Sequence, residues 1–190
     1  MNFLETSFQP NENQQQMLEH TKSAYFPWYF QENMLLDVNK ENIFFYSHAL
    51  RKRSGSGILP EEGEINSEIT QGMEKLFLQI AKSSGVEVDV ILRSAVNATH
   101  YATQLTSEIH VDHNFEHSNF LFYLNDVTGG ETLVFDKDKS TILKTITPTK
   151  YKAVFFSGYP HAHKFCALGE RRLVFVVTFI GKIPPKELMP

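Results

Sequence analysis

The sequence predicts an α+β protein with a double-stranded β-helix, or jelly-roll, core and N-terminal helices packed on one sheet. Two observations support this. A strong helical pattern lies in the N-terminal half, and from Val86 onward short β-branched and aromatic runs are separated by turn signals. Many short strands of this kind suit a roll that closes its edges. The 190 residues suit a single domain, 1–190, with a helical part over about 1–86 and the jelly-roll core over about 87–181.

Two helices are expected in the N-terminal part. The run from Asn11 to Ser23 is rich in helix formers with few apolar anchors, which predicts a short amphipathic helix. Between residues 66 and 82, apolar side chains recur at helical spacing, and Asn66 or Ser67 is the candidate cap. Gly85 then supplies a stop.

Two further N-terminal segments have distinctive compositions. Tyr25 to Phe30 gathers aromatic residues around Pro27, which is typical of an anchor to the core; a substrate-binding wall is the alternative. Arg51 to Glu64 combines charge with Gly, Ser and Pro, which predicts an exposed loop, either a lid or a plain solvated excursion. Its basic cluster, residues 51–53, is either simply solvated or a contact for a phosphate or an acidic peptide.

The C-terminal half is expected to be mostly strands. Gly129-Gly130 and Gly158 break the chain between them, and Glu131-Thr132 restarts a strand. The predicted strands are Val88–Ala98, Leu105–Asp112, Ser118–Leu124, Glu131–Phe135, Thr141–Thr145, Lys152–Phe156 and Arg171–Ile180.

Composition narrows the partners. Lys and Arg number 18 against 22 Asp and Glu, for a formal charge of -4, which argues against nucleic acid and anionic membranes. The single cysteine, Cys166, cannot form an internal disulfide, so a reducing compartment is expected. The chain shows neither a signal-peptide pattern nor a long apolar run, which predicts a cytoplasmic protein without a membrane partner.

Three residues suggest a metal site. In the predicted strand ending IHVDH, alternation places His110 and Asp112 on one face. His161, about fifty residues downstream, would complete the set from a neighbouring strand. Two histidines and one carboxylate form the facial triad of non-haem Fe(II) oxygenases, which leaves positions open for a co-substrate and O2. His163 shares the parity of His161 and is the rival third ligand.

An arginine follows the third ligand, at the start of a long apolar strand. Arg171 and Arg172 compete for this place, since they must point to opposite faces and hydrophobicity alone does not decide between them. A guanidinium on an inward face could bind a carboxylate through two parallel hydrogen bonds.

Taken together, these motifs resemble the 2-oxoglutarate/Fe(II) dioxygenase superfamily, in its prolyl-4-hydroxylase-like branch of bacteria and phages. The resemblance spans about residues 93–179. The matching elements, in order, are Arg93, Asn97, Tyr101, His110 and Asp112, Tyr123-Leu124-Asn125, Gly129-Gly130-Glu131-Thr132, Pro160-His161, and Arg172 leading to Phe179.

The resemblance implies a hydroxylase that uses Fe(II), O2 and 2-oxoglutarate and releases succinate and CO2, with ascorbate as a candidate reductant. Its register selects Arg172 for the distal carboxylate of 2-oxoglutarate, with Tyr101 or Tyr123 and Asn97 completing the pocket. A carboxylate at Asp112 favours hydroxylation over halogenation. A peptidyl proline leads as substrate, followed by a free amino acid or another small molecule.

Two rival functions remain at this point. A cupin-like binding protein could hold a metal or ligand on the same roll without turnover, although cupin sites usually draw on more histidines and a glutamate. A catalytically inactive relative serving as an interaction domain is the other. Oxygen-dependent succinate formation would separate an enzyme from both.

Overall fold

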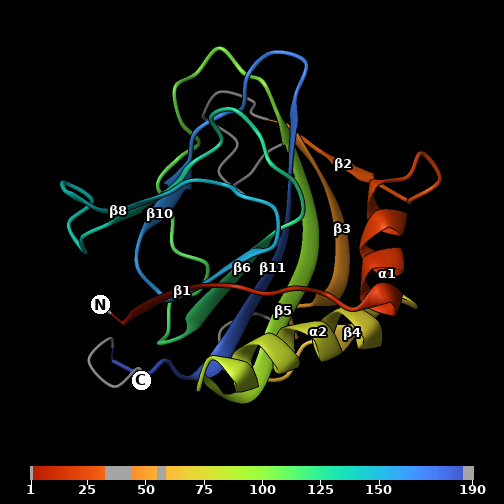
Figure 1. Ribbon diagram of the computed structural model, residues 1–190. Coiled ribbons are helices and arrows are strands. Elements are labelled where there is room, and N and C mark those ends of the chain that lie inside the picture. The colour runs from red at the N-terminus through yellow and green to blue at the C-terminus, as the bar shows by residue number, and fades with distance from the viewer. Residues whose placement is uncertain (1, 33–43, 55–58, 186–190) are drawn as a thin grey trace.

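The computed structural model describes residues 2–32, 44–54 and 59–185. Figure 1 shows a large sheet with both helices on one side and a small sheet on the other. The large sheet runs in the order β1-β9-β6-β11-β5-β3-β2, with β4 paired to β3, and the small one in the order β10-β7-β8. The strands are β1 (Phe3–Ser7), β2 (Tyr29–Gln31), β3 (Phe45–Lys52), β4 (Glu64–Ile65), β5 (Glu87–His100), β6 (Ser118–Tyr123), β7 (Thr132–Phe135), β8 (Ile142–Ile146), β9 (Lys152–Ser157), β10 (His161–His163) and β11 (Arg171–Lys182).

Alternation along β11 separates two faces of the large sheet. Phe175 and Phe179 belong to the main core, together with Phe77 of a helix, and we call this the outer face. Val174 packs in a second core with Tyr123 and Val134, between the two sheets. Arg172 and Thr178 share the parity of Val174, so they lie on this second side, which we call the inner face.

The two helices begin in different ways, one with a side-chain cap and one without. Helix α1 (Glu12–Lys22) begins at Asn11, which forms a capping box with Gln14, so the expected helix is confirmed. Helix α2 (Thr70–Ser83) begins after Ile69 without a side-chain cap, so the expected caps Asn66 and Ser67 were wrong. Both have other partners: the Asn66 amide donates to a backbone carbonyl, and the Ser67 hydroxyl bonds to His48.

The N-terminal part is less helical than expected, because β1 to β4 also lie there. The longest of these, β3, pairs with β5, and its burial comes from that pairing rather than from a clear alternation in its own sequence. In the aromatic segment, Phe26 is buried and Trp28 packs against the core, whereas Tyr25 is 92% exposed. The anchor is therefore confined to part of that segment.

The predicted strand Leu105–Asp112 is not a regular strand. Only Thr106 and His110 form isolated bridges, to Lys164 and His161. Leu105 is 88% exposed, so the apolar side chains of this segment do not share one buried face. The remaining six predicted strands are confirmed within a few residues as β5, β6, β7, β8, β9 and β11.

The predicted loop from Arg51 to Glu64 begins with a buried residue. Arg51 ends in a two-pronged ion pair with Glu74 of α2, with Nε to Oε1 at 2.8 Å and Nη2 to Oε2 at 2.9 Å. The hydrogen bonds from Arg51 to Glu74 raise the pKa of Arg51. The expectation that Arg51 belongs to a solvated cluster was wrong, because the carboxylate that holds it lies far along the chain. The lid prediction falls partly on residues 55–58, outside the described residues.

Replacing Arg51 with alanine is expected to lower the free energy of unfolding by about 3–5 kcal/mol, because it leaves Glu74 charged and buried. Ser94 would remain as a partner of that carboxylate. Urea unfolding would measure the loss, and Lys52→Ala, which removes an exposed cation from the next position, should change stability by less than about 0.5 kcal/mol. Equal losses in both variants would contradict this account.

Candidate metal centre and co-substrate pocket

His110 and His161 are placed side by side by the backbone. The two residues exchange both backbone hydrogen bonds, at 3.0 and 2.9 Å, in an isolated antiparallel bridge. Such a pair has its side chains on one face, and the imidazole centroids are 4.5 Å apart. A single bridge therefore brings the two imidazoles together, where a regular strand was expected.

Each imidazole is oriented by a carbonyl two residues earlier. Nδ1 of His110 lies 3.0 Å from the carbonyl oxygen of Glu108, and Nδ1 of His161 lies 3.1 Å from that of Tyr159. A carbonyl only accepts, so Nδ1 is the protonated nitrogen in both rings. Nε2 of each ring is then left with a lone pair for a metal, which is the usual arrangement of metal-binding histidines.

Asp112 completes the group. Its Oδ2 lies 3.5 Å from Nε2 of His161, and one candidate ligand atom from each of His110, Asp112 and His161 lies within 4.8 Å of the others. Burial acts to raise the pKa of Asp112, but the charges of His161, His110 and Arg93 together lower it far below its usual range. The carboxylate is therefore ionised and ready to bind a cation.

The apo-protein is expected to lose stability as the pH falls from 6.5 to about 4. Burial lowers the pKa of His161 and of His113 from 6.5 to about 4. The unfolded chain takes up these protons below pH 6.5, whereas the folded chain does so only near pH 4. The free energy of unfolding should therefore fall across this window, by up to roughly 3 kcal/mol per histidine. Asp112 does not contribute to this loss between pH 6.5 and 4, because the stability that it provides is lost only as the pH falls below its ordinary pKa of 3.8.

Urea unfolding at pH 7.5, 6.0 and 4.5 measures this loss, and His113→Gln should reduce the slope. A free energy of unfolding that stays level from pH 7.5 to 4.5 would contradict it.

Arg172 lies buried on the inner face. It is 4% exposed, its Nη2 donates to the Thr132 hydroxyl at 2.9 Å, and its Cζ lies 5.3 Å from the centre of the Tyr123 ring. Its Nε has no hydrogen-bond partner, and no ion pair to Arg172 occurs among the described residues. A buried guanidinium without a counter-ion is costly, which points to a bound anion as the missing partner.

Thr132 organises this pocket, and sequence reasoning missed it. Its hydroxyl oxygen lies 2.8 Å from the Tyr123 hydroxyl as well as 2.9 Å from Arg172. Gly130 also contributes, since a Cβ there would come within 3.1 Å of the Arg172 side chain, and its φ of +71° suits glycine. The Gly-Gly-Glu-Thr motif was expected to be a turn and strand start only; it also shapes the space around Arg172.

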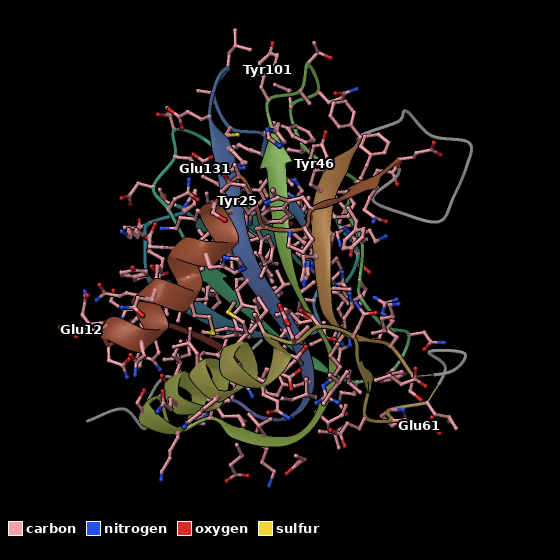
Figure 2. The ribbon with its side chains drawn as sticks, turned by 90° about the vertical axis from the view of Figure 1, so that its right-hand side faces the viewer. Glu12, Tyr25, Tyr46, Glu61, Tyr101 and Glu131 are labelled. Carbon is pink, nitrogen blue, oxygen red and sulfur yellow. The ribbon has the colours of Figure 1, made fainter. Side chains whose placement is uncertain are left out.

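The other expected pocket residues are distributed unevenly. Asn97 pairs with Val174 on the inner face and accepts a hydrogen bond from Ser47. Tyr101 was expected to complete the pocket, but it lies beyond the end of β5 and is 49% exposed, so it does not share the face of Arg93 and Asn97 (Figure 2). The regular alternation needed for that pattern stops one residue before Tyr101.

Arg171 and His163, the alternatives that the sequence offered for Arg172 and His161, do not take those places. Arg171 points to the opposite face of β11 from Arg172, and its side chain donates to the backbone carbonyl of Lys22. His163 is not in the triad; burial and then the charge of Arg172 lower its pKa well below the usual value. The charge of Arg172 acts on His163, which places it on the Arg172 side of the site, and its Nε2 is buried with no hydrogen-bond partner among the described residues.

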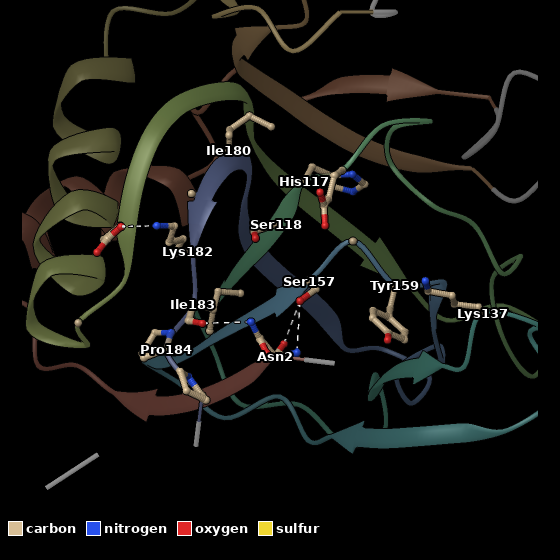
Figure 3. Close-up of a pocket in the computed structure, with 16 residues that line it drawn as sticks. Asn2, His117, Ser118, Lys137, Ser157, Tyr159, Ile180, Lys182, Ile183 and Pro184 are labelled. Carbon is tan, nitrogen blue, oxygen red and sulfur yellow. Dashed lines mark hydrogen bonds and ion pairs between the residues drawn. The ribbon is translucent and has the colours of Figure 1, made fainter. Parts of the chain in front are cut away.

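A cavity of about 830 Å³ opens near the triad but does not contain it. Figure 3 shows His117, Ser157, Tyr159 and Lys182 among its lining residues. The lining carries both acidic and basic groups and none of the three candidate ligands. We therefore place the candidate site at the triad and Arg172 rather than in this cavity.

No protein-family model and no curated protein sequence matches the chain. Solved structures do. A 2OG-Fe(II) oxygenase family oxidoreductase of Burkholderia pseudomallei superposes with a TM-score of 0.69 at 12% identity, over 97% of this chain and 88% of that one. A prolyl hydroxylase of Trichoplax adhaerens, in complex with a peptide fragment of hypoxia inducible factor, gives 0.61 at 13% identity, over 94% and 83%.

A third similar structure is the epimerase SnoN with Fe3+, alpha ketoglutarate and nogalamycin RO, with a TM-score of 0.59 at 10% identity, over 94% of this chain and 78% of that one. At these identities the likeness establishes the fold, which is the jelly-roll type expected from the sequence. In the described part of the chain, the helices are too short or too polar to cross a bilayer.

Proposed function

We propose that this protein is an Fe(II)- and 2-oxoglutarate-dependent oxygenase that hydroxylates an unactivated C–H bond. The observation that carries the proposal is the pairing of two features on one inner face: a two-histidine, one-carboxylate group, and a buried arginine that has no counter-ion among the described residues. Either feature alone also occurs in proteins that bind neither iron nor a keto acid. Together they match a metal and a co-substrate that carries a second carboxylate.

The residues fit a divalent iron. His110, Asp112 and His161 offer two neutral nitrogens and one ionised oxygen from one side, and the second nitrogen of each ring is already bonded to a carbonyl. Three protein ligands on one face leave the other positions for small molecules. Bound there, iron would supply the activation of O2 and the oxidation of the substrate.

The residues also fit 2-oxoglutarate. Arg172, with Thr132 and the Tyr123 hydroxyl, would hold the distal carboxylate, while the keto acid end reaches the metal. Val174 and Val134 exclude water from the space around them, since both are almost wholly buried. A dry pocket strengthens the charged hydrogen bonds to Arg172. Asn97 remains a candidate contact in this pocket. Of the two candidate tyrosines we favour Tyr123, because Tyr101 is 49% exposed.

For the substrate, a prolyl or other peptidyl residue is our first proposal and a small molecule the second. The similar structures include enzymes with both kinds of ligand, a peptide fragment in one and nogalamycin RO in the other. The chain's acidic balance argues against nucleic acid. We also propose a location in the cytoplasm, from the single unpaired cysteine.

The test is formation of succinate from 2-oxoglutarate in the presence of Fe(II), with ascorbate as reductant, under air and under argon. We expect succinate to form under air only, and to be lost in Asp112→Ala. Substrate candidates are then ranked by how far they stimulate turnover. Metal binding without any succinate formation would favour the cupin-like binding role instead.

A further inference from the structure

We propose that Arg93 and Arg53 form an anion-binding subsite on the far side of the triad from Arg172, and that the substrate carries a carboxylate that binds there. This rests on the proposed function and narrows its substrate class. The carboxylate belongs either to a free small acid or to an acidic residue of a peptide.

The subsite lies along one row of the inner face. Arg93 of β5 and Asn119 of β6 pair with Thr178 of β11 from its two sides, so the three side chains point the same way. Phe156 pairs with Asn119 and contacts the ring of His161, 5.4 Å between centroids. The row therefore runs directly beside the metal ligands.

The segment that follows Asp112 covers this row. His113 bonds through Nε2 to the Thr178 hydroxyl at 2.9 Å. From the end of β3, Nη2 of Arg53 reaches to 3.8 Å from Oδ1 of Asp112. Arg53 and Arg93 thus approach the same carboxylate from two strands, and the charges of both act on His113.

Two polar side chains of this row, Arg93 and Asn119, lack partners in the part of the chain that the structure describes. Arg93 makes no hydrogen bond or ion pair among the described residues. Burial lowers its pKa, and Asp112 is the carboxylate that opposes this. Asn119 is 3% exposed, yet neither its side-chain oxygen nor its nitrogen has a hydrogen-bond partner among the residues that the structure describes. Buried polar groups are normally paired, so this row is prepared for a polar ligand.

The charges of the loaded site leave these two arginines in excess. A doubly positive metal and Arg172 are balanced by Asp112 and a doubly negative 2-oxoglutarate. Asp112 is the carboxylate that acts on both Arg53 and Arg93, so once it is counted against the metal, neither arginine has an acidic partner of its own among the described residues; Arg93 is partly buried. A substrate carboxylate would supply the missing charge, and two guanidiniums suit it geometrically.

Competition with 2-oxoglutarate is avoided by distance. Thr178, the neighbour of Arg93, lies six residues along β11 from Arg172, which corresponds to roughly 20 Å. The two arginine sites therefore lie toward opposite ends of the same face. The charge of Asp112 acts on Arg93, whereas the charge of Arg172 acts on His163 of β10.

The experiment uses the protein loaded with Mn(II) and saturating 2-oxoglutarate, with trifluoroacetate as probe and trifluoroacetamide as its neutral match. Paramagnetic relaxation of the fluorine signal reports how close each probe binds to the metal. We expect a strong effect for the acid and a weak one for the amide. Arg93→Gln should weaken acid binding by about tenfold, Arg53→Gln by less, and Arg93→Lys should retain most of it. Lys52→Gln, an exposed neighbour, is the control.

Equal effects of acid and amide, or an effect of the acid that survives in Arg93→Gln, would overturn the subsite while leaving the proposed function intact. Failure of Mn(II) to bind, seen in water proton relaxation, would instead count against the proposed function and the subsite together. Melting curves and Mn(II) affinity of each variant confirm that it is folded and loaded.

Competition then distinguishes the two sources of the carboxylate. Displacement of trifluoroacetate by N-acetylglycine alone assigns a small free acid. Displacement by a blocked peptide with an internal aspartate assigns an acidic peptide residue. Displacement by neither would count against the subsite.

Discussion

Replacing His161 with alanine is expected to weaken Fe(II) binding by at least about 100-fold and to abolish succinate formation. Loss of even a supporting hydrogen bond at a metal site costs about 10–100-fold, and loss of a ligand should cost more. In the described part of the chain, three residues bring one candidate ligand atom each to this place, so the variant keeps only His110 and Asp112. Anaerobic Fe(II) titration measures the affinity.

His163→Ala is the matched control, since His163 lies two residues along the same strand and was the rival ligand in the sequence. It should retain Fe(II) affinity, because His163 is not part of the triad. Its proximity to Arg172 predicts a change in 2-oxoglutarate affinity only. Retention of iron by His161→Ala together with its loss from His163→Ala would exchange the two assignments.

Replacing Arg172 with glutamine is expected to weaken 2-oxoglutarate binding by about 100-fold, with Fe(II) affinity unchanged. Removing one partner of a buried, hydrogen-bonded charge pair costs about 2–5 kcal/mol. Arg172 is 4% exposed and bonds to Thr132, so no water can easily replace it. Isothermal titration of the Fe(II) or Mn(II) protein with 2-oxoglutarate gives the affinity.

Arg171→Gln provides the control for that prediction. Arg171 is adjacent in sequence, has the same charge and donates to a backbone carbonyl of α1. Its replacement should leave 2-oxoglutarate affinity within about twofold of wild type, since surface changes usually alter free energies by no more than about 0.5 kcal/mol. A larger effect at Arg171 than at Arg172 would mean that the co-substrate binds on the outer face of β11.

Much of the roll could be predicted because its strands carry local signals. The β-branched and aromatic runs of β5, β6, β9 and β11 are bounded by Gly or polar residues, and alternation correctly assigned opposite faces to Arg171 and Arg172. Which face was inward depended on neighbours from other strands. That information is not present within β11 itself.

The predictions that failed concern residues positioned by contacts between segments far apart in the sequence. The segment ending at Asp112 was expected to be a strand, but His110 is positioned by a single bridge to His161. Arg51 was expected to be solvated. It is instead buried against Glu74, a residue distant in sequence whose contact with Arg51 forms only in the folded protein. Asn119 had no signal of its own, since it belongs to no motif and its importance comes from what lies opposite it. Arg53 was marked only as part of the basic cluster 51–53, and its place beside Asp112 could not be read from the sequence.

The measurement that tests the central claim most directly is an anaerobic titration of the apo-protein with Fe(II) and then 2-oxoglutarate, followed by visible absorption. The proposed site predicts a weak metal-to-ligand charge-transfer band that needs both additions, is absent in His110→Ala, and requires far more 2-oxoglutarate in Arg172→Gln. Wild-type protein that binds no iron and develops no band would contradict the assignment of an Fe(II) and 2-oxoglutarate site to this face of the roll.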